Sequence, residues 1–338
     1  MLGQELGTVV TRQTGAVDPH GQGPIYVCTT NDALDWVLEV TPRSRRRDLV
    51  LFQNGWLAPW LGHNSLWLGG AGEAAAAKDL GAAAADVAEG KAAARKAAGV
   101  GAVTGPTTTA TGAGAGAAPG VAGEGDEVTL VALYMAAGPD GTAKDGLRTV
   151  ASGRWAHHVS RTLARGGVRC RAVRGADMYV AVVEKLLWAC VFWMLSSALG
   201  GMKVGDIVEE HRDDVAALTA ELLPPLCRQL RAMAAVPAAA VAVAAGEEED
   251  SAGREAAGAA AAAAATLEAG TERVVAALVE YSLSIAGAVP SRDMAVAEFR
   301  WRNGALLDMG PTPRHVAWLR RAGVPQELLQ AHGVAAGV

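Results

Sequence analysis

A lysine lies near the start of a long apolar run in the sequence. The run extends from Val183 to Gly200 and carries one charged pair, Glu184 and Lys185, near its beginning. Because an ammonium group is costly to take out of water, a lysine at this position could mark a reactive site. The alternative is that Lys185 lies at the entrance of a helix and extends its ammonium into water. The sequence leaves both interpretations open.

Two shorter segments carry further polar candidates. Asn54 and Gly55 directly follow an expected strand, although Asn-Gly is also an ordinary turn dipeptide. Glu298 begins the segment EFRWRNG. Since Arg302 lies four residues later, the two side chains could simply form an ion pair on one helix face. Neither segment establishes a site by itself.

The elements around these residues begin with a strand, helix, strand pattern. Pro24–Thr29 and Asp48–Phe52 are expected strands, and Ala33–Thr41 between them is an expected helix with one apolar face. This order is typical of a parallel sheet. The β-rich segment Thr8–Arg12 predicts a further short strand.

Strands and a helix are expected again from Glu127, and long helices replace them from Ala176. Strands are expected over 128–136, 147–151 and 168–173, with a helix over 155–165. From Ala176 onward long helices are expected, including 206–233, 267–286 and 313–322, with a further ordered segment over 294–307. Pro224 and Pro225 are expected to kink or split the first of these. The sequence therefore predicts an α/β half followed by an all-α half.

Two tracts of alanine and glycine interrupt this order. Residues 69–126 offer few side chains that could pack, so a largely disordered surface insertion is expected there. Within it, GAGAG at 112–116 lacks the flanking strand and helix that a phosphate-binding loop requires. The second tract, residues 234 to about 265, is likewise not expected to contribute to a core.

Charge and length argue against two classes of partner. The net charge is −5 and the basic cluster at 43–47 is short, so no nucleic-acid partner is expected. The uncharged run after Lys185 ends at Gly200 and Gly201, which falls short of the roughly 20 apolar residues of a membrane span. No membrane partner is therefore expected.

Cysteine and histidine spacing argues against a metal site. The cysteines lie far apart, without a C-x-x-C spacing, at positions 28, 170, 190 and 227. They predict reduced thiols and neither a zinc site nor a disulfide framework. His157 and His158 would lie on different helix faces, so no metal is expected. The N-terminus lacks the apolar stretch of a secretory signal. An intracellular location, cytoplasm or plastid, is expected, with the compartment unknown.

Three separated segments, taken in order, resemble one family. They are Gln53-Asn54-Gly55 after a strand, EKLLWAC at 184–190 and EFRWRNG at 298–304, the last followed by a proline-led helix. Together they resemble the ketopantoate reductase (2-dehydropantoate 2-reductase) family, of the 6-phosphogluconate dehydrogenase C-terminal-like superfamily. The resemblance covers Pro24 to about Leu68 and Glu127 to about Gln330, which leaves out most of both alanine and glycine tracts.

The resemblance implies a fold of class α/β with two domains. Residues 1–68 and 127–175 would form a partial Rossmann-like parallel sheet that binds a dinucleotide. Residues 176–330 would form an all-α domain that closes over a substrate and can mediate a homodimer. The low-complexity tracts at 69–126 and about 234–265 would be insertions.

The resemblance also implies a reaction and its residues. NADPH would pass a hydride to the keto carbon of a small 2-keto acid, with Lys185 as proton donor to the developing alkoxide. Glu298 would help to bind substrate and position the reacting groups. Asn54 and Gly55 would lie beside the nicotinamide. Further candidates by position are Ser291 and Asn303 for the substrate and Arg12 for the 2′-phosphate of NADP.

The sequence departs from the family in two places. The first strand and its G-x-G-x-x-G turn are absent, and Ala189 and Trp193 stand where the family carries asparagines. The second departure makes ketopantoate itself doubtful as a substrate, because Trp193 would either fill the pocket or reshape it for a different, more apolar carbonyl compound. Three hypotheses follow: a divergent, N-terminally incomplete reductase, a non-catalytic binding or dimerisation protein, and a chain whose missing strand and turn precede the first methionine given.

Overall fold

A computed structural model describes residues 8–64, 66–68, 126–137, 143–240 and 251–335 of the chain. All of them belong to one of the two units into which the chain divides, Met1–Gly70 with Gly125–Val338. The expected insertion at 69–126 lies outside the described residues, apart from Asp126. The GAGAG stretch and the turn expected at 139–141 lie outside them as well.

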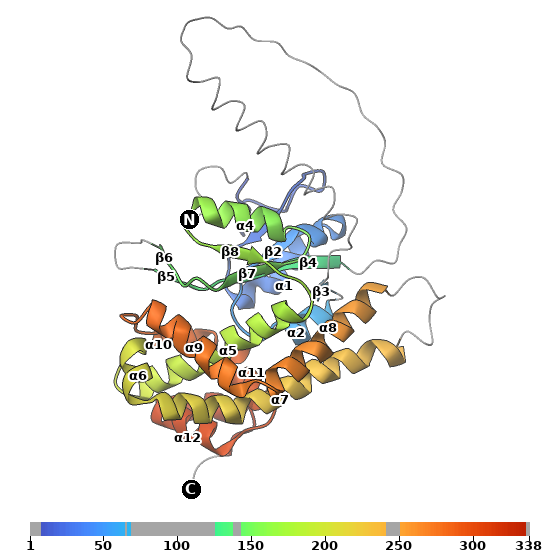
Figure 1. Cartoon of the computed structure of the whole chain (residues 1–338). Coiled ribbons are helices and arrows are strands. Elements are labelled where there is room, and N and C mark those ends of the chain that lie inside the picture. The colour runs from blue at the N-terminus through green and yellow to red at the C-terminus, as the bar shows by residue number, and fades with distance from the viewer. Residues whose placement is uncertain (1–7, 65, 69–125, 138–142, 241–250, 336–338) are drawn as a thin grey trace, which may run out of the picture. The chain divides into compact units, whose positions relative to one another are not determined.

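The fold is mixed α/β and its sheet is mostly parallel (Figure 1). The path through the sheet is β1 (Ile25–Val27), β2 (Leu49–Leu51), β4 (Asp126–Ala132), β7 (Thr149–Ser152) and β8 (Cys170–Ala172), with β3 (Leu66–Leu68) pairing with the start of β4. β1, β2, β3 and β4 run parallel to one another, and β7 and β8 run parallel to each other. The change of direction falls between β4 and β7, which pair antiparallel.

The first crossover confirms the strand, helix, strand pattern. β1 is followed by a short 3₁₀ helix, Asn31–Ala33, and by α1 (Leu34–Val40), and β2 then pairs parallel to β1. The three residues of β2 are fully buried, as the strands of a parallel sheet covered on both faces are. A second 3₁₀ helix, Arg43–Asp48, leads into β2, and α2 (Ala58–His63) follows it.

The alternation of side chains along the strands separates two apolar clusters. Val50 packs in a smaller cluster with residues of α4 (Ala156–Arg165), which lies along one face of the sheet in Figure 1. Leu49 and Leu51 belong to the larger cluster, which includes residues of α1 and of α5 (Ala176–Ala198). The main core therefore joins the sheet to the helices that follow it.

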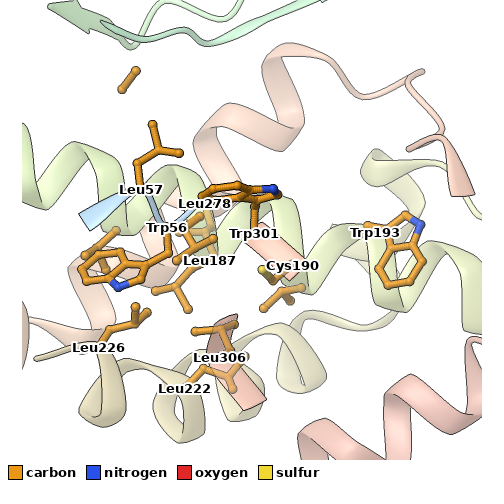
Figure 2. Packing of buried hydrophobic residues seen from close by; sticks show 14 of the residues in the cluster. Trp56, Leu57, Leu187, Cys190, Trp193, Leu222, Leu226, Leu278, Trp301 and Leu306 are labelled. Atoms are coloured by element: carbon orange, nitrogen blue, oxygen red, sulfur yellow. The ribbon is translucent and has the colours of Figure 1, made fainter. Parts of the chain in front are cut away.

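Helix α5 is the centre of the larger cluster. It is long and apolar enough to cross a membrane, yet 83% of its most apolar window is buried inside the protein. Such burial is that of a core helix. Figure 2 shows three of its side chains, Leu187, Cys190 and Trp193, with the first two packed among leucines of neighbouring helices.

The remaining helices follow α5 along the chain. They are α6 (Val204–Glu210), α7 (Arg212–Ala240), α8 (Ser251–Glu268), α9 (Thr271–Ser284), α10 (Arg292–Ala297), α11 (Asn303–Asp308), α12 (Pro313–Arg321) and α13 (Gln326–Ala331). The split expected at Pro224 and Pro225 is wrong, because α7 continues through both prolines and the break falls at His211. The alternative, a kink at the prolines, stays a prediction. The segment at 294–307 is divided by a 3₁₀ turn, Phe299–Trp301.

Helix α8 corrects the expectation for the second alanine tract. Most of its length lies within residues 234–265, and it packs along α7 and against α5. Ala260, Ala263 and Ala264 are buried in the main core. Methyl side chains add little area each, but they allow two helix backbones to approach closely and so contribute to a core through contact.

Two further details differ from the sequence-based expectations. Residues 8–11 have no regular secondary structure and residues 12–14 form a turn, so Thr8–Arg12 is not a strand. The segment expected as one strand over 128–136 is divided into β4 and β5 (Met135–Ala137), and β5 forms a two-stranded antiparallel hairpin with β6 (Ala143–Asp145).

Candidate functional site

Lys185 lies well inside α5 and not at its entrance. The helix begins at Ala176, and the lysine is only 9% exposed. Its Nζ lies 4.7 Å from the ring centroid of Tyr134, 5.1 Å from that of Tyr281 and 5.5 Å from that of Trp188. Among the described residues its ammonium has no hydrogen-bond or ion-pair partner. The interpretation of Lys185 as a solvated residue at a helix end is therefore wrong.

Two opposing effects act on the ammonium group of Lys185. Desolvation by burial, assisted by the charge of Arg302, lowers the pKa of Lys185 to about 7. The three aromatic rings act in the other direction, because their electron-rich faces attract a cation. An amine with a pKa near 7 can both hold and release a proton near neutrality, which general acid catalysis requires.

The turn after β2 is held tightly by its neighbours. Gln53 donates from Nε2 to the carbonyl oxygens of Val27 and Thr29, both at 3.1 Å. Asn31 donates from Nδ2 to the carbonyl oxygen of Asn54 at 2.6 Å. Gly55 has φ +125°, a value that side chains rarely allow, so the backbone at this position requires glycine.

The C-terminal segment closes against the same turn. Trp56 donates its backbone N–H to the carbonyl oxygen of Trp301 at 2.7 Å, and a Cβ on Gly55 would lie 2.6 Å from that oxygen. Trp301 also donates from Nε1 to Asp32 at 2.9 Å. Figure 2 shows Trp56 and Trp301 in one apolar cluster, with Trp193 to one side. Residues far apart in sequence thus share one backbone junction.

Two cavities meet at Lys185 and Asn54. The smaller, of about 30 Å³, also borders Gln53 and Gly55. The larger, of about 190 Å³, is bordered by α5, α9 and the segment that follows α9. Trp193 and Ala189 line the larger cavity, so the two positions where the family carries asparagines face it here. The volume suits a small molecule and is below that of typical drug-sized sites.

Glu298 reaches the site only through its partner. It forms an ion pair with Arg302, four residues later, as the simpler interpretation of the sequence predicted. The pair does not lie on one continuous helix, because a 3₁₀ turn separates the two residues. Arg302 borders the larger cavity and Glu298 does not.

Of the other three predicted residues, one lines the larger cavity, one is buried in the core and one is exposed. Ser291 lines the larger cavity, and its hydroxyl caps α10 by accepting from the backbone N–H of Met294 at 3.2 Å. Asn303 borders neither cavity; it is buried and its Oδ1 lies 2.8 Å from Nε2 of His315. Arg12 also borders neither, and its guanidinium lies over the ring of Trp36, 5.9 Å from the centroid.

Sequence reasoning missed the groups that set the properties of Lys185. Trp188 stands three positions after the lysine, which places both on one helix face. That spacing could have identified it. Tyr134 and Tyr281 come from distant segments, and no local pattern marks them. Arg302 was identified only as a partner of Glu298, although it also lines the larger cavity.

The turn with Asn54 and Gly55 lies at the edge of the sheet where ligands of parallel sheets bind. Ligands of parallel sheets bind beyond the carboxyl ends of the strands, and the turn with Asn54 and Gly55 directly follows the carboxyl end of β2. In the described part of the chain no glycine-rich turn between a strand and a helix forms a pyrophosphate cradle, and the connection after β1 holds Cys28, Thr29 and Thr30. The described residues thus place a lysine and an asparagine beside adjoining cavities, without a cradle for a pyrophosphate.

Comparison with known proteins leaves the family unassigned. No protein-family model matches the sequence, and no curated protein matches it either.

Proposed function

We propose that this chain is a divergent NADPH-dependent reductase of a small 2-keto acid or a related carbonyl compound. In this proposal the sheet is a partial Rossmann-like dinucleotide-binding domain, and the helices from α5 onward form a substrate and dimerisation domain. The observation that carries the proposal is that the three segments of the family resemblance meet. Lys185, the Asn54-Gly55 turn and the Trp301–Arg302 segment surround adjoining cavities.

The chemistry follows from the placement of Lys185. When bound, NADPH supplies the hydride that adds to the carbonyl carbon. Lys185 gives a proton from Nζ to the carbonyl oxygen as negative charge develops there, and a neutral amine remains. Arg302 adds positive charge beside the same cavity, and Glu298 holds Arg302 in place. Glu298 is therefore a positioning residue in this proposal.

The test is NADPH binding followed by turnover. Calorimetric titration with NADPH, with NADH for comparison, should show saturable binding, and a set of 2-keto acids should then oxidise NADPH. Lys185→Ala should reduce turnover at least about a hundredfold, the effect typical of removing a general acid. Lys144→Ala is the matched control, because Lys144 is exposed on β6. Unchanged turnover in Lys185→Ala would contradict the proposal.

The second candidate is a protein that binds a small molecule or dimerises without catalysis. The observation that favours it is the lack of a pyrophosphate cradle in the described part of the chain, together with Trp193 and Ala189 at the cavity. This candidate predicts no binding of NADPH at millimolar concentration, with the fold intact. The two candidates are thus separated by the first titration.

A further inference from the structure

The charges that border the larger cavity are all positive. Its charged lining residues are Lys185 and Arg302, with no carboxylate among them. Glu298 pairs with Arg302 but stays outside the lining, so protonated Lys185, Arg302 and Glu298 together leave one positive charge. Buried charges are normally compensated by a charge of opposite sign. Whenever Lys185 is protonated, the cavity therefore lacks one negative charge.

Arg302 has a hydrogen-bond donor that its ion pair with Glu298 does not use. Its side chain is 11% exposed, and the pair with Glu298 uses Nη2. Nε is buried and has no hydrogen-bond partner in the described part of the chain. A guanidinium presents its donors in a planar fork that matches a carboxylate. An anionic group in this cavity would lie beside the guanidinium of Arg302, which borders it.

The rest of the lining is largely apolar. Trp193, Ile285 and Ala189 border the interior, while Val289 and Met294 lie at the border with solvent, 52% and 57% exposed. Large apolar side chains at a cavity rim bury area when a ligand covers them. A ligand that fits the lining therefore has a charged end and an apolar body.

We propose that Arg302 anchors the carboxylate of a small monocarboxylic acid whose bulky apolar side chain packs against Trp193 and the rim formed by Val289 and Met294. This inference rests on the proposed function, and it specifies the substrate class as 2-keto monocarboxylates with branched or aromatic side chains. Arg302 and Trp193 are then residues that determine specificity.

The test uses a probe that cannot be reduced, so that binding is independent of catalysis. The probe is 4-methylpentanoate, titrated into the full chain by calorimetry with and without NADPH. Its uncharged isostere 4-methylpentanamide and the short acid acetate are the comparison ligands. We expect the acid to bind at least about tenfold more tightly than the amide, because a charge-assisted hydrogen bond is lost, and at least about tenfold more tightly than acetate.

Variants test which residues cause the preference for acid over amide and the preference for 4-methylpentanoate over acetate. Arg302→Gln should abolish the preference for acid over amide, and the double variant Arg302→Gln with Glu298→Gln should do the same without leaving a buried carboxylate unpaired. Arg300→Gln is the matched control, because Arg300 is exposed. Met294→Ser should weaken the binding of 4-methylpentanoate a few-fold and leave acetate unchanged.

The outcomes separate this inference from the proposed function. Equal binding of acid and amide to the wild-type chain, or no binding of either with or without NADPH, overturns the inference. So does an equal loss in Arg300→Gln and Arg302→Gln. Acid binding without any NADPH-dependent turnover would contradict the proposed reductase and leave the carboxylate site intact.

Discussion

Burial of the Lys185 ammonium group lowers the stability of the folded chain at neutral pH. This group is buried among three aromatic rings without a hydrogen-bond partner in the described residues. A side chain chosen for packing alone would be apolar here, as most of its neighbours on α5 are. Residues that destabilise a fold without a structural benefit are typical of functional sites.

The same burial predicts a dependence of stability on pH. The pKa of Lys185 is lowered from 10.5 to about 7 in the folded chain. Between these values the unfolded chain holds a proton that the folded chain has released, so stability rises with pH. Relative to Lys185→Met, the free energy of unfolding of the wild type should rise by up to about 1.4 kcal/mol per pH unit above pH 7.

Urea unfolding at pH 7, 8 and 9 measures this difference. Groups that titrate in both proteins cancel in the comparison. Lys185→Met should also be the more stable protein at pH 7, because it buries no charge. Stabilities that change in parallel with pH would show that Lys185 keeps its ordinary pKa.

Sequence reasoning identified Lys185 and the Asn54-Gly55 turn but not their environment. A lysine within an apolar run and a turn after a strand are local patterns. Tyr134, Tyr281 and the carbonyl oxygen of Trp301 reach these residues through tertiary packing. Lys185 and the turn could therefore be identified from local patterns, whereas the groups around them could not. The predictions for Glu298, Asn303 and Arg12 named residues that border neither cavity.

At the scale of elements, Gly55 joins the turn after β2 to the segment before α11. Its φ is +125°, and an added Cβ would lie 2.6 Å from the carbonyl oxygen of Trp301. Gly55→Ala should therefore strain the backbone and push the two segments apart. We expect a loss of about 2 to 4 kcal/mol in the free energy of unfolding, the sum of backbone strain and overpacking.

Gly310→Ala separates the two contributions to this loss. Gly310 has φ +126°, but its Cβ would meet nothing within 4 Å. The control should lose only the strain, about 1 to 2 kcal/mol. Equal losses in thermal or urea unfolding would mean that the contact with Trp301 contributes nothing to stability.

Helix α8 makes a second prediction at this scale. Ala263 is fully buried in the main core, while Ala262 beside it is exposed. Ala263→Leu should lower the free energy of unfolding by about 1 to 3 kcal/mol, because three added carbons must displace packed neighbours. Ala262→Leu should change stability by less than about 0.5 kcal/mol. A similar effect of both substitutions would contradict the packing of α8.

The elements were predicted best where apolar residues follow a clear period. β1, α1 and β2 came out in the right order because each strand is a short apolar run and the apolar residues of the helix recur along one face. α8 was missed because alanine carries little periodic signal, although Ala260, Ala263 and Ala264 are buried. The split predicted at the prolines of α7 does not occur, since tertiary packing can override the low helix propensity of proline.

At the scale of the whole described unit, ion pairs join the sheet region to two helices. Arg148, just before β7, donates to Glu184 of α5 at 2.8 Å and to Glu280 of α9 at 2.6 Å. The side chain of Glu184 is 10% exposed, whereas that of Glu280 is 71% exposed. The pair with Glu184 should therefore affect the free energy of unfolding more than the pair with Glu280, because exposed ion pairs contribute little.

Removal of Arg148 should leave a buried carboxylate without a partner. Arg148→Met is expected to lower the free energy of unfolding by about 3 kcal/mol at pH 8. Burial already raises the pKa of Glu184, and Arg148 opposes this rise. Without the arginine the folded-state pKa rises further, so the folded chain keeps a proton that the unfolded chain releases above about pH 4.5. The destabilisation should therefore grow with pH.

Urea unfolding across pH 5 to 8 tests this sign, with Glu184→Gln as the matched control. Glutamine at position 184 carries no charge, so no buried carboxylate is left unpaired when Arg148 is removed. The double variant Arg148→Met with Glu184→Gln should therefore recover part of the stability lost in Arg148→Met, and its stability should not show the pH dependence of that variant. A double-mutant cycle then gives the coupling between the two residues. If Arg148→Met destabilised the chain equally at every pH, its effect would come from lost packing, and the junction between sheet and helices would owe its stability to the apolar core alone.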